Sequence, residues 1–205
     1  PTAGLHFTPE LIAEMREQGF SFEEVTLHVG AGTFLPVKDE NAAQHNMHTE
    51  HFVITRQTLQ NILHNAGRIV AVGTTSVRTM ESLAALAWRI KCTGTPNVEQ
   101  VVGQWELYDI PAEFLCKDVA EVLLNYMTDN GLEQLKAATQ IMITPLGYHF
   151  RIVNYIITNF HQPKSTLLLL VSAYVGDNWK RIYDYALAND FRFLSYGDSS
   201  LLKVY

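Results

Sequence analysis

The chain has 205 residues, of which 47% are hydrophobic and 18% charged, and this composition is typical of a globular protein whose core needs no disulfide or metal. Its formal net charge of −6 excludes a surface that is basic overall, so nucleic-acid binding would need a local patch built from only 15 Lys and Arg residues. The two cysteines, Cys92 and Cys116, form no CxxC pair and indicate a reducing compartment rather than a disulfide scaffold.

The start of the chain shows neither an initiator Met nor the basic and apolar regions of a signal peptide. The longest apolar run, after Lys164, falls well below the roughly 18–20 residues that span a bilayer. We therefore expect a cytoplasmic protein with no membrane part, and a chain that is a segment of a longer protein.

The first third is predicted to contain two helices and two strands. Thr8-Pro9-Glu10 starts the first helix, because Thr8 can cap it and Pro9 suits its first position; Gly19 ends it. The further expected elements are a strand over Phe20–Val29, a glycine break at Gly30–Thr33, a loop over Pro36–Asn46, a strand over His51–Thr55 and a helix over Thr55–Ala66.

The clearest local unit follows. Arg68–Val72 is a buried strand, Gly73–Ser76 a tight turn and Val77–Ile90 a helix. This order is the usual way in which α/β proteins aim a helix N-terminus at a ligand.

The remainder continues the alternation of strands and helices. The expected elements are a loop over Thr93–Asn97, a strand over Gln104–Tyr108, a helix over Asp118–Met127, a short helix or turn over Gly131–Ala138, a strand over Ile141–Ile143, a β-rich run over Tyr148–Ile157, a helix over Asn178–Ala188 and a strand over Phe191–Ser195. The pattern predicts one α/β domain over residues 1–205, layered or barrel-like, with a largely parallel sheet.

A polar corner precedes an apolar helix in Thr158–Gly176. Pro163 suits a turn, and Lys164-Ser165-Thr166 can cap the free amides of the helix. Such a corner is a ready ligand site, although a cap that binds only its own helix is the better explanation of this stretch taken alone.

Three further clusters carry candidate chemistry. The segment His45–His51 is rich in metal-type ligands but lacks a zinc spacing, and a strand would place His48 and Glu50 on one face with His51 opposite. That arrangement suits proton transfer, whereas a metal hydrolase through three histidines or a solvated loop are the alternatives. Gly30-Ala31-Gly32 lacks the third glycine of a dinucleotide site.

The Gly73-Thr74-Thr75-Ser76 turn offers amides and hydroxyls at a helix start, and Arg78 adds a cation. The group suits a ribose, carboxylate or phosphate. The structural alternative is a capping turn in which Arg78 pairs with Glu81 at i,i+3.

Seven segments together resemble the S-adenosylmethionine:tRNA ribosyltransferase-isomerase family of queuosine biosynthesis. They are Pro1–Thr8, Leu27–Val37, Met47–Glu50, Arg68–Ser82, Gly147–Phe150, Thr158–Gly176 and Phe191–Asp198. They follow in a fixed order along nearly the whole chain, whereas residues 92–140 carry little of the resemblance.

The resemblance implies a transferase-isomerase that moves the ribosyl part of S-adenosylmethionine onto preQ1 at the tRNA wobble position, giving epoxyqueuosine and releasing adenine and methionine. It implies tRNA as partner, S-adenosylmethionine as substrate, and neither cofactor nor metal. Proton transfers in this chemistry need an acid and a base, and His48, Glu50 and His161 are the candidates. The candidate substrate-binding residues are Gly73, Thr74, Thr75, Arg78, Asn159, Lys164, Ser165, Tyr196 and Asp198.

The chain also departs from the family pattern. Members carry an N-terminal portion with a β-barrel domain before the segment that matches Pro1–Thr8, and this sequence has no counterpart of it. Leu146 is an extra residue in a P-G-Y turn, and Gln162 stands where the family often has Leu. The alternative function is a non-catalytic ligand- or tRNA-binding module built on the same scaffold.

Overall fold

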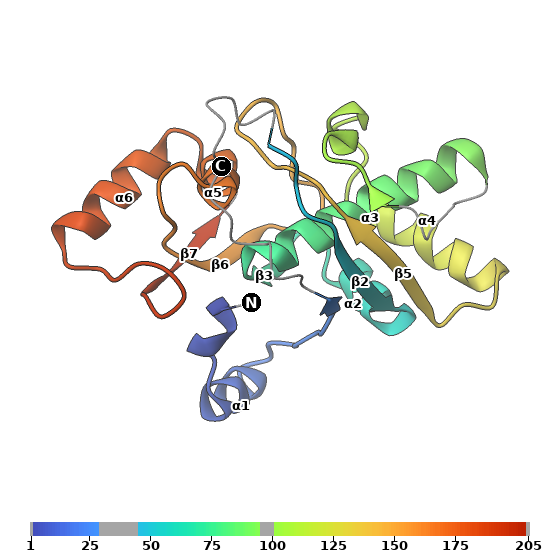
Figure 1. Ribbon diagram of the computed structural model, residues 1–205. Coiled ribbons are helices and arrows are strands. Elements are labelled where there is room, and N and C mark those ends of the chain that lie inside the picture. The colour runs from blue at the N-terminus through green and yellow to red at the C-terminus, as the bar shows by residue number, and fades with distance from the viewer. Residues whose placement is uncertain (1, 29–44, 95–100, 204–205) are drawn as a thin grey trace.

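The computed structural model describes residues 2–28, 45–94 and 101–203, and Figure 1 shows their arrangement. Helix α3 runs through the middle, with α2, α4, β2 and β5 to one side and α5, α6, β6 and β7 to the other. In chain order the elements are the 3-10 helix η1 (Thr2–His6), α1 (Pro9–Glu17), β1 (Thr26–His28), β2 (Glu50–Thr55), α2 (Arg56–His64), β3 (Val70–Val72), α3 (Thr74–Thr93), β4 (Val101–Val102), the 3-10 helix η3 (Glu106–Asp109), α4 (Cys116–Asp129), β5 (Gln134–Thr139), β6 (Tyr155–Asn159), α5 (Thr166–Val175), α6 (Asn178–Ala188) and β7 (Ser199–Lys203).

The described strands form two sheets, with the orders β1-β2-β5-β4 and β3-β6-β7. The mixed α/β class is confirmed, but the largely parallel sheet only in part. β3–β6 and β4–β5 are parallel, whereas β1–β2, β2–β5 and β6–β7 are antiparallel. Strand direction depends on how the connections pack, which the residue pattern of one strand does not encode.

Helix α3 joins the two sheets. Every residue from Val77 to Ala87 is buried, and the helix contacts β4 and β5 of one sheet and β3 and β6 of the other. A helix that is buried on all sides belongs to the core. It begins at Thr74 rather than Val77, so most of the predicted turn is its first turn, and Gly94 ends it in the left-handed conformation.

Several predicted helices are confirmed. The Thr8 hydroxyl accepts a hydrogen bond from the Leu11 amide at 3.2 Å, with Pro9 at the first helical position of α1. The α6 helix has the predicted bounds.

Other predicted elements were wrong, because tertiary contacts override local pattern. Gln104–Tyr108 contains the 3-10 helix η3 instead of a strand, and Gly131–Ala138 lies largely in strand β5. Ile141–Ile143 is buried but forms no strand, since the Ile141 carbonyl accepts from Arg78 and the Met142 amide donates to the Gln104 carbonyl. Of Phe20–Val29, the structure shows a strand only over β1.

The last predicted strand is also wrong. Phe191–Ser195 is not a strand, because Leu194 has a φ of 72° that breaks extended backbone. The strand in this region is β7, which pairs with β6 and buries Leu202. Strand β7 was not predicted, because its first two residues, Ser199 and Ser200, are not typical strand residues.

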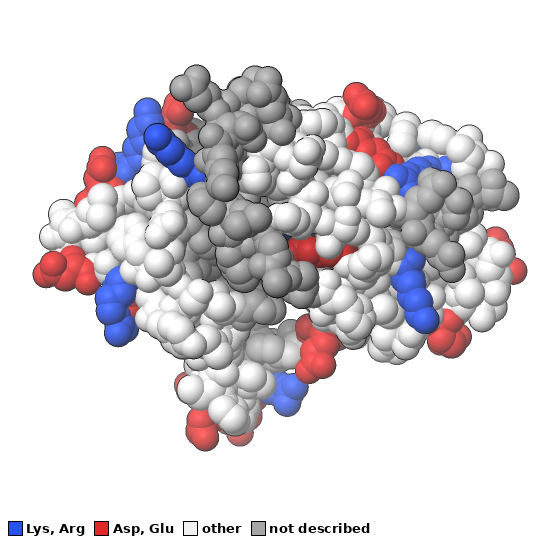
Figure 2. Space-filling view, viewed as in Figure 1, with Lys and Arg blue, Asp and Glu red and all other residues white. Residues whose placement is uncertain are grey.

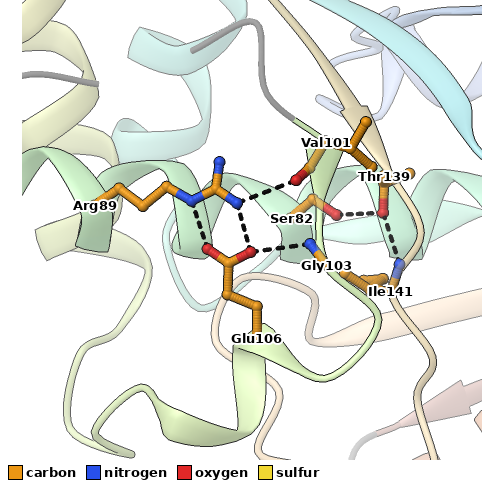
Figure 3. Close-up of polar contacts among 7 residues, drawn as sticks. All are labelled: Ser82, Arg89, Val101, Gly103, Glu106, Thr139 and Ile141. Atoms are coloured by element: carbon orange, nitrogen blue, oxygen red, sulfur yellow. Dashed lines mark hydrogen bonds and ion pairs between the residues drawn. The ribbon is translucent and has the colours of Figure 1, made fainter. Parts of the chain in front are cut away.

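An ion pair fastens the segment around β4 and η3 to α3 (Figure 3). Arg89 Nε donates to Glu106 Oε1 at 2.6 Å, and Arg89 Nη2 donates to the Val101 carbonyl at 3.1 Å. Glu106 Oε2 also accepts from the Gly103 amide at 2.9 Å. Residues 101–140, which carry little of the sequence resemblance, are thus built into the core around α3.

The surface shows no dominant charge on the face in Figure 2. Its described Lys and Arg side chains stand apart from one another among Asp and Glu side chains. Within the described ranges, no helix combines the length and the apolar character needed to cross a bilayer.

Candidate functional site

The carboxyl ends of the parallel strands β3 and β6 lie side by side. Val72 pairs with Ile157, and the Gly73 amide donates to the Ile157 carbonyl at 2.8 Å. Loops that leave neighbouring parallel strands at this edge form the usual ligand site of α/β proteins. The edge brings together two sequence-predicted groups, the Gly73–Thr75 helix start and the Asn159–His161 corner.

The start of α3 has no side-chain cap. Gly73 has a φ of 92°, a conformation that favours glycine, and provides no side-chain cap. Thr74 is buried and Thr75 half-buried. The first-turn amides therefore keep their capacity to bind an anion or hydroxyl oxygen.

Asn159 holds the loop that leads to β7. Its Nδ2 donates to the carbonyls of Leu194 at 2.9 Å and Ser195 at 3.3 Å. Its Oδ1, in a side chain that is 3% exposed, has no hydrogen-bond partner among the described residues. An unpaired buried acceptor at this edge marks a place for a ligand donor.

Asp198 closes the same loop. Its Oδ2 accepts from the Arg192 amide at 2.7 Å, and this bond lowers the pKa of the Asp198 carboxyl, with smaller contributions from the Arg192 guanidinium and His6. Tyr196 is 87% exposed at the loop tip. The electrostatic link to His6 places the N-terminal motif near this loop.

His161 is partly buried just after the end of β6. Its Nε2 lies 2.9 Å from Thr158 Oγ1, and its amide donates to the Tyr183 hydroxyl at 3.1 Å. Burial lowers the pKa of His161 from 6.5 to about 4. The imidazole is therefore neutral at pH 7 and has the form of a proton acceptor.

His161 predicts a measurable acid sensitivity. Because its folded pKa is depressed from 6.5 to about 4, the unfolded state binds the proton first, and stability falls as the pH drops through this window. Between neutral pH and about pH 5, the wild type is expected to lose on the order of 2 kcal/mol more unfolding free energy than His161→Gln. Urea unfolding at both pH values measures this. His64→Gln, at an exposed helical position, is the control, and equal losses in wild type and His161→Gln would contradict the assignment.

Lys164 and Ser165 shape the start of α5. Lys164 is exposed with a φ of 56°. Ser165 Oγ accepts from the Leu168 amide at 3.2 Å and donates to the Gln162 carbonyl at 2.7 Å, so the hydroxyl serves as the helix cap. Substrate contacts by these two residues stay a prediction.

Glu50 and Arg78 form a buried ion pair. Arg78 Nη1 lies 2.9 Å from Glu50 Oε2, and Arg78 Nε donates to the Ile141 carbonyl at 3.1 Å. Glu50 is 0% exposed and Arg78 5% exposed. Burial lowers the pKa of Arg78, and the Glu50 charge opposes that shift. Arg78 lies one helical turn from Thr74, on the same side of α3.

The ion pair is incomplete on both sides. Arg78 Nη2 and Glu50 Oε1 are buried, and neither has a hydrogen-bond partner among the described residues. An unmade hydrogen bond on a buried charged group costs about 1–3 kcal/mol or more. One donor and one acceptor therefore stand ready for a ligand.

The expected shared face of His48 and Glu50 is wrong. Strand β2 begins at Glu50, and His48 precedes it with an exposed side chain. The side-chain amide of Gln104 hydrogen-bonds to the backbone of this segment. It donates to the His45 carbonyl at 2.8 Å and accepts from the Met47 amide at 3.1 Å. His51 lies on the exposed face of β2, opposite Glu50, as predicted. Among the described residues, no three His, Cys, Asp or Glu side chains gather as a metal site.

Glu81 is a buried polar centre, and its partners differ from the one that the structural alternative offered. It does not pair with Arg78. Its Oε1 accepts from the Ile152 and Val153 amides at 3.0 and 2.9 Å, and its Oε2 from the Arg151 amide and the Tyr148 hydroxyl at 2.9 and 3.0 Å. Burial raises the pKa of Glu81, and these bonds partly offset the rise. A lone acid within the apolar run of α3 is the sequence signal for a buried, fully partnered carboxylate.

Three sequence predictions fall wholly or partly where no structure is described. The Gly30-Ala31-Gly32 turn and most of the Pro36–Asn46 loop lie within residues 29–44. The end of the Thr93–Asn97 loop lies within residues 95–100.

Comparison with known proteins identifies the family. A family model described as "Queuosine biosynthesis protein" matches residues 1–202. The chain belongs to the queuosine biosynthesis protein family. It is 43% identical over 206 aligned positions to a Bradyrhizobium diazoefficiens protein and 42% identical over 207 to a Brucella ovis protein, both named S-adenosylmethionine:tRNA ribosyltransferase-isomerase.

The alignments cover 98% and 99% of this queuosine-family chain but only 44% and 45% of those relatives, so the chain spans about half their length. A crystal structure of the S-adenosylmethionine tRNA ribosyltransferase from Thermotoga maritima is 30% identical and superposes with a TM-score of 0.61. That match covers 97% of this chain and 50% of the other. The resemblance in the seven motifs therefore extends to the whole fold.

Proposed function

We propose that this chain carries the chemistry of an S-adenosylmethionine:tRNA ribosyltransferase-isomerase. The reaction moves the ribosyl part of S-adenosylmethionine onto preQ1 at the tRNA wobble position and yields epoxyqueuosine, adenine and methionine. The names of the relatives at 42–43% identity support the reaction class. S-adenosylmethionine is then a substrate that is consumed, no separate cofactor takes part, and the tRNA substrate points to a cytoplasmic enzyme.

The incomplete ion pair of Arg78 and Glu50 is the observation that supports this function best. The methionine end of S-adenosylmethionine carries a carboxylate and an ammonium group. Arg78 Nη2 is an unpaired donor that suits the carboxylate, and Glu50 Oε1 an unpaired acceptor that suits the ammonium. A zwitterionic amino acid fills both positions at once.

The other groups at the edge fit the remainder of the substrate. We assign the ribose hydroxyls to the amides and hydroxyls of Gly73, Thr74 and Thr75, and a donor of the substrate to Asn159 Oδ1. The neutral His161 imidazole is the proposed base, because its pKa of about 4 keeps it unprotonated at pH 7.

The outer positions complete the proposed site. His48 is the acid candidate, since it is exposed just ahead of β2, two residues before Glu50. Lys164, Ser165, Tyr196 and Asp198 are proposed to border the site from the α5 start and the β7 loop. The described face in Figure 2 has no gathered basic patch, so we propose that tRNA binding draws on the part of the relatives that this chain does not cover.

Adenine release tests the proposal. S-adenosylmethionine is incubated with preQ1-containing tRNA and either this chain alone or this chain joined to the remaining half of a full-length relative. Equimolar adenine and methionine are expected from the joined protein, with no release from tRNA that lacks preQ1. Binding without release in both proteins would favour the alternative, a non-catalytic binding module.

A further inference from the structure

A closed ring of hydrogen bonds begins and ends on Arg78. Its Nε donates to the Ile141 carbonyl at 3.1 Å, and the Ile141 amide donates to Thr139 Oγ1 at 3.2 Å. Thr139 Oγ1 lies 2.7 Å from Ser82 Oγ, which lies 2.7 Å from the Arg78 carbonyl. We propose that Ser82 and Thr139 are positioning residues that fix the Arg78 guanidinium so that its Nη2 faces the substrate.

The Ser82 hydroxyl links the two halves of the ring. Ser82 Oγ is placed to donate both to the Arg78 carbonyl and to Thr139 Oγ1, so its single hydrogen is shared between these two acceptors, and Thr139 Oγ1 also accepts from the Ile141 amide. Ser82 and Thr139 are both 0% exposed, so no solvent competes for these bonds. Figure 3 shows the Ser82 side chain of α3 pointing at Thr139, with Thr139 next to the Ile141 amide.

The ring lies beside the ion pair. Glu50 and Thr139 are direct partners in the antiparallel pair β2–β5, and Arg78 and Ser82 are one turn apart on α3. Each member of the sheet pair therefore meets one member of the helix pair: Glu50 meets Arg78, and Thr139 meets Ser82. These two contacts hold α3 against β2 and β5 at the point where the guanidinium is bound.

The ring and the ion pair determine which guanidinium nitrogen of Arg78 has no hydrogen-bond partner. Nε is taken by Ile141 and Nη1 by Glu50, so Nη2 alone has no partner among the described residues. Loss of the Thr139 hydroxyl removes the acceptor of the Ile141 amide and frees the carbonyl that anchors Nε. The guanidinium can then turn away from its binding position. Ser82 and Thr139 were absent from the sequence-predicted site, because neither is expected to touch the substrate.

The test compares Thr139→Val, Thr139→Ser and Ser82→Ala, and it rests on the proposed function only for its second readout. The first readout is hydrogen exchange of the Arg78 Nε–H by NMR with labelled arginine. Thr139→Val and Ser82→Ala are expected to exchange at least about tenfold faster than wild type, and Thr139→Ser is expected to restore protection. The second readout is the KM for S-adenosylmethionine, expected to rise about tenfold with the KM for tRNA unchanged.

Thr79→Val is the matched control. Thr79 is on the same helix and 0% exposed, and its hydroxyl has no partner among the described residues, so the variant loses no hydrogen bond. Unchanged Arg78 exchange in Thr139→Val would overturn the proposal, as would faster exchange with an unchanged KM for S-adenosylmethionine. If the wild-type chain joined to the remaining half of a full-length relative shows no turnover, the proposed function fails, whereas the exchange result still decides whether the ring positions Arg78.

Discussion

Arg78→Lys is expected to lower kcat/KM for S-adenosylmethionine by about 100-fold while the protein stays folded. A lysine ammonium can still meet Glu50 Oε2, but its three donors all lie on one nitrogen and cannot span the positions that Nε, Nη1 and Nη2 of Arg78 reach. The loss of the separate Nη2 donor to the substrate carboxylate accounts for the size of the effect. Steady-state kinetics with preQ1-containing tRNA, together with thermal unfolding, measure it.

Two comparisons separate binding from stability in this experiment. Arg68→Lys, at an exposed position before β3, is expected to behave as wild type. Glu50→Gln should cost about 3–5 kcal/mol of stability, because it leaves the Arg78 cation buried without its counter-charge, and Glu50→Leu with Arg78→Leu should regain much of that loss yet stay inactive. Near-normal kcat/KM in Arg78→Lys would remove Arg78 from the substrate site.

Glu81→Gln is expected to be the most destabilising conservative change in the described part of α3, lowering the unfolding free energy by about 3–5 kcal/mol and the Tm by about 10 °C. Both carboxylate oxygens accept two hydrogen bonds each, three of the four from backbone amides. A glutamine amide group would turn its own N–H donors toward two of these donors. Urea unfolding and calorimetry measure the loss.

The control is Glu113→Gln, since Glu113 is exposed before α4 and its neutralisation should change stability by no more than about 0.5 kcal/mol. A small effect of Glu81→Gln, equal to that of Glu113→Gln, would show that the carboxylate does not hold residues 148–153. The strand β6 and the His161 corner follow directly on this segment. The hydrogen bonds to Glu81 therefore hold the segment that leads into β6 and the His161 corner of the proposed site.

The sequence predicted best those helices whose ends are marked by capping or helix-starting residues. Thr8 and Pro9 start α1, and α6 has the bounds that its pattern indicates, whereas α3 begins at Thr74, three residues before the predicted start. Strand β5 was missed because Gln134 and the alanines at 137 and 138 have weak strand propensity, and its pairing with β2 decides its structure. Long-range pairing also makes the sheets mixed rather than largely parallel.

The sequence singled out candidate site residues one by one, but not the contacts between them. Glu50 and Arg78 were both singled out, yet their contact joins residues 28 positions apart and depends on how β2 packs on α3. Ser82 ends one of the segments that resemble the family, but neither it nor Thr139 was singled out as a site residue, since a buried hydroxyl looks like any small core residue until its partners are known. Ser165 and Asp198 proved to have structural roles, as a helix cap and a loop closure.

The most direct test of the proposed function is to follow the ribosyl carbons themselves. S-adenosylmethionine labelled with carbon-13 in the ribose is incubated with preQ1-containing tRNA and the protein joined to the remaining half of a full-length relative. The tRNA is then digested to nucleosides for mass spectrometry. We predict a modified wobble nucleoside that carries all the ribose label, together with unlabelled adenine and methionine. Label that remains in an adenosyl product, with none in the tRNA, would contradict the proposed transfer.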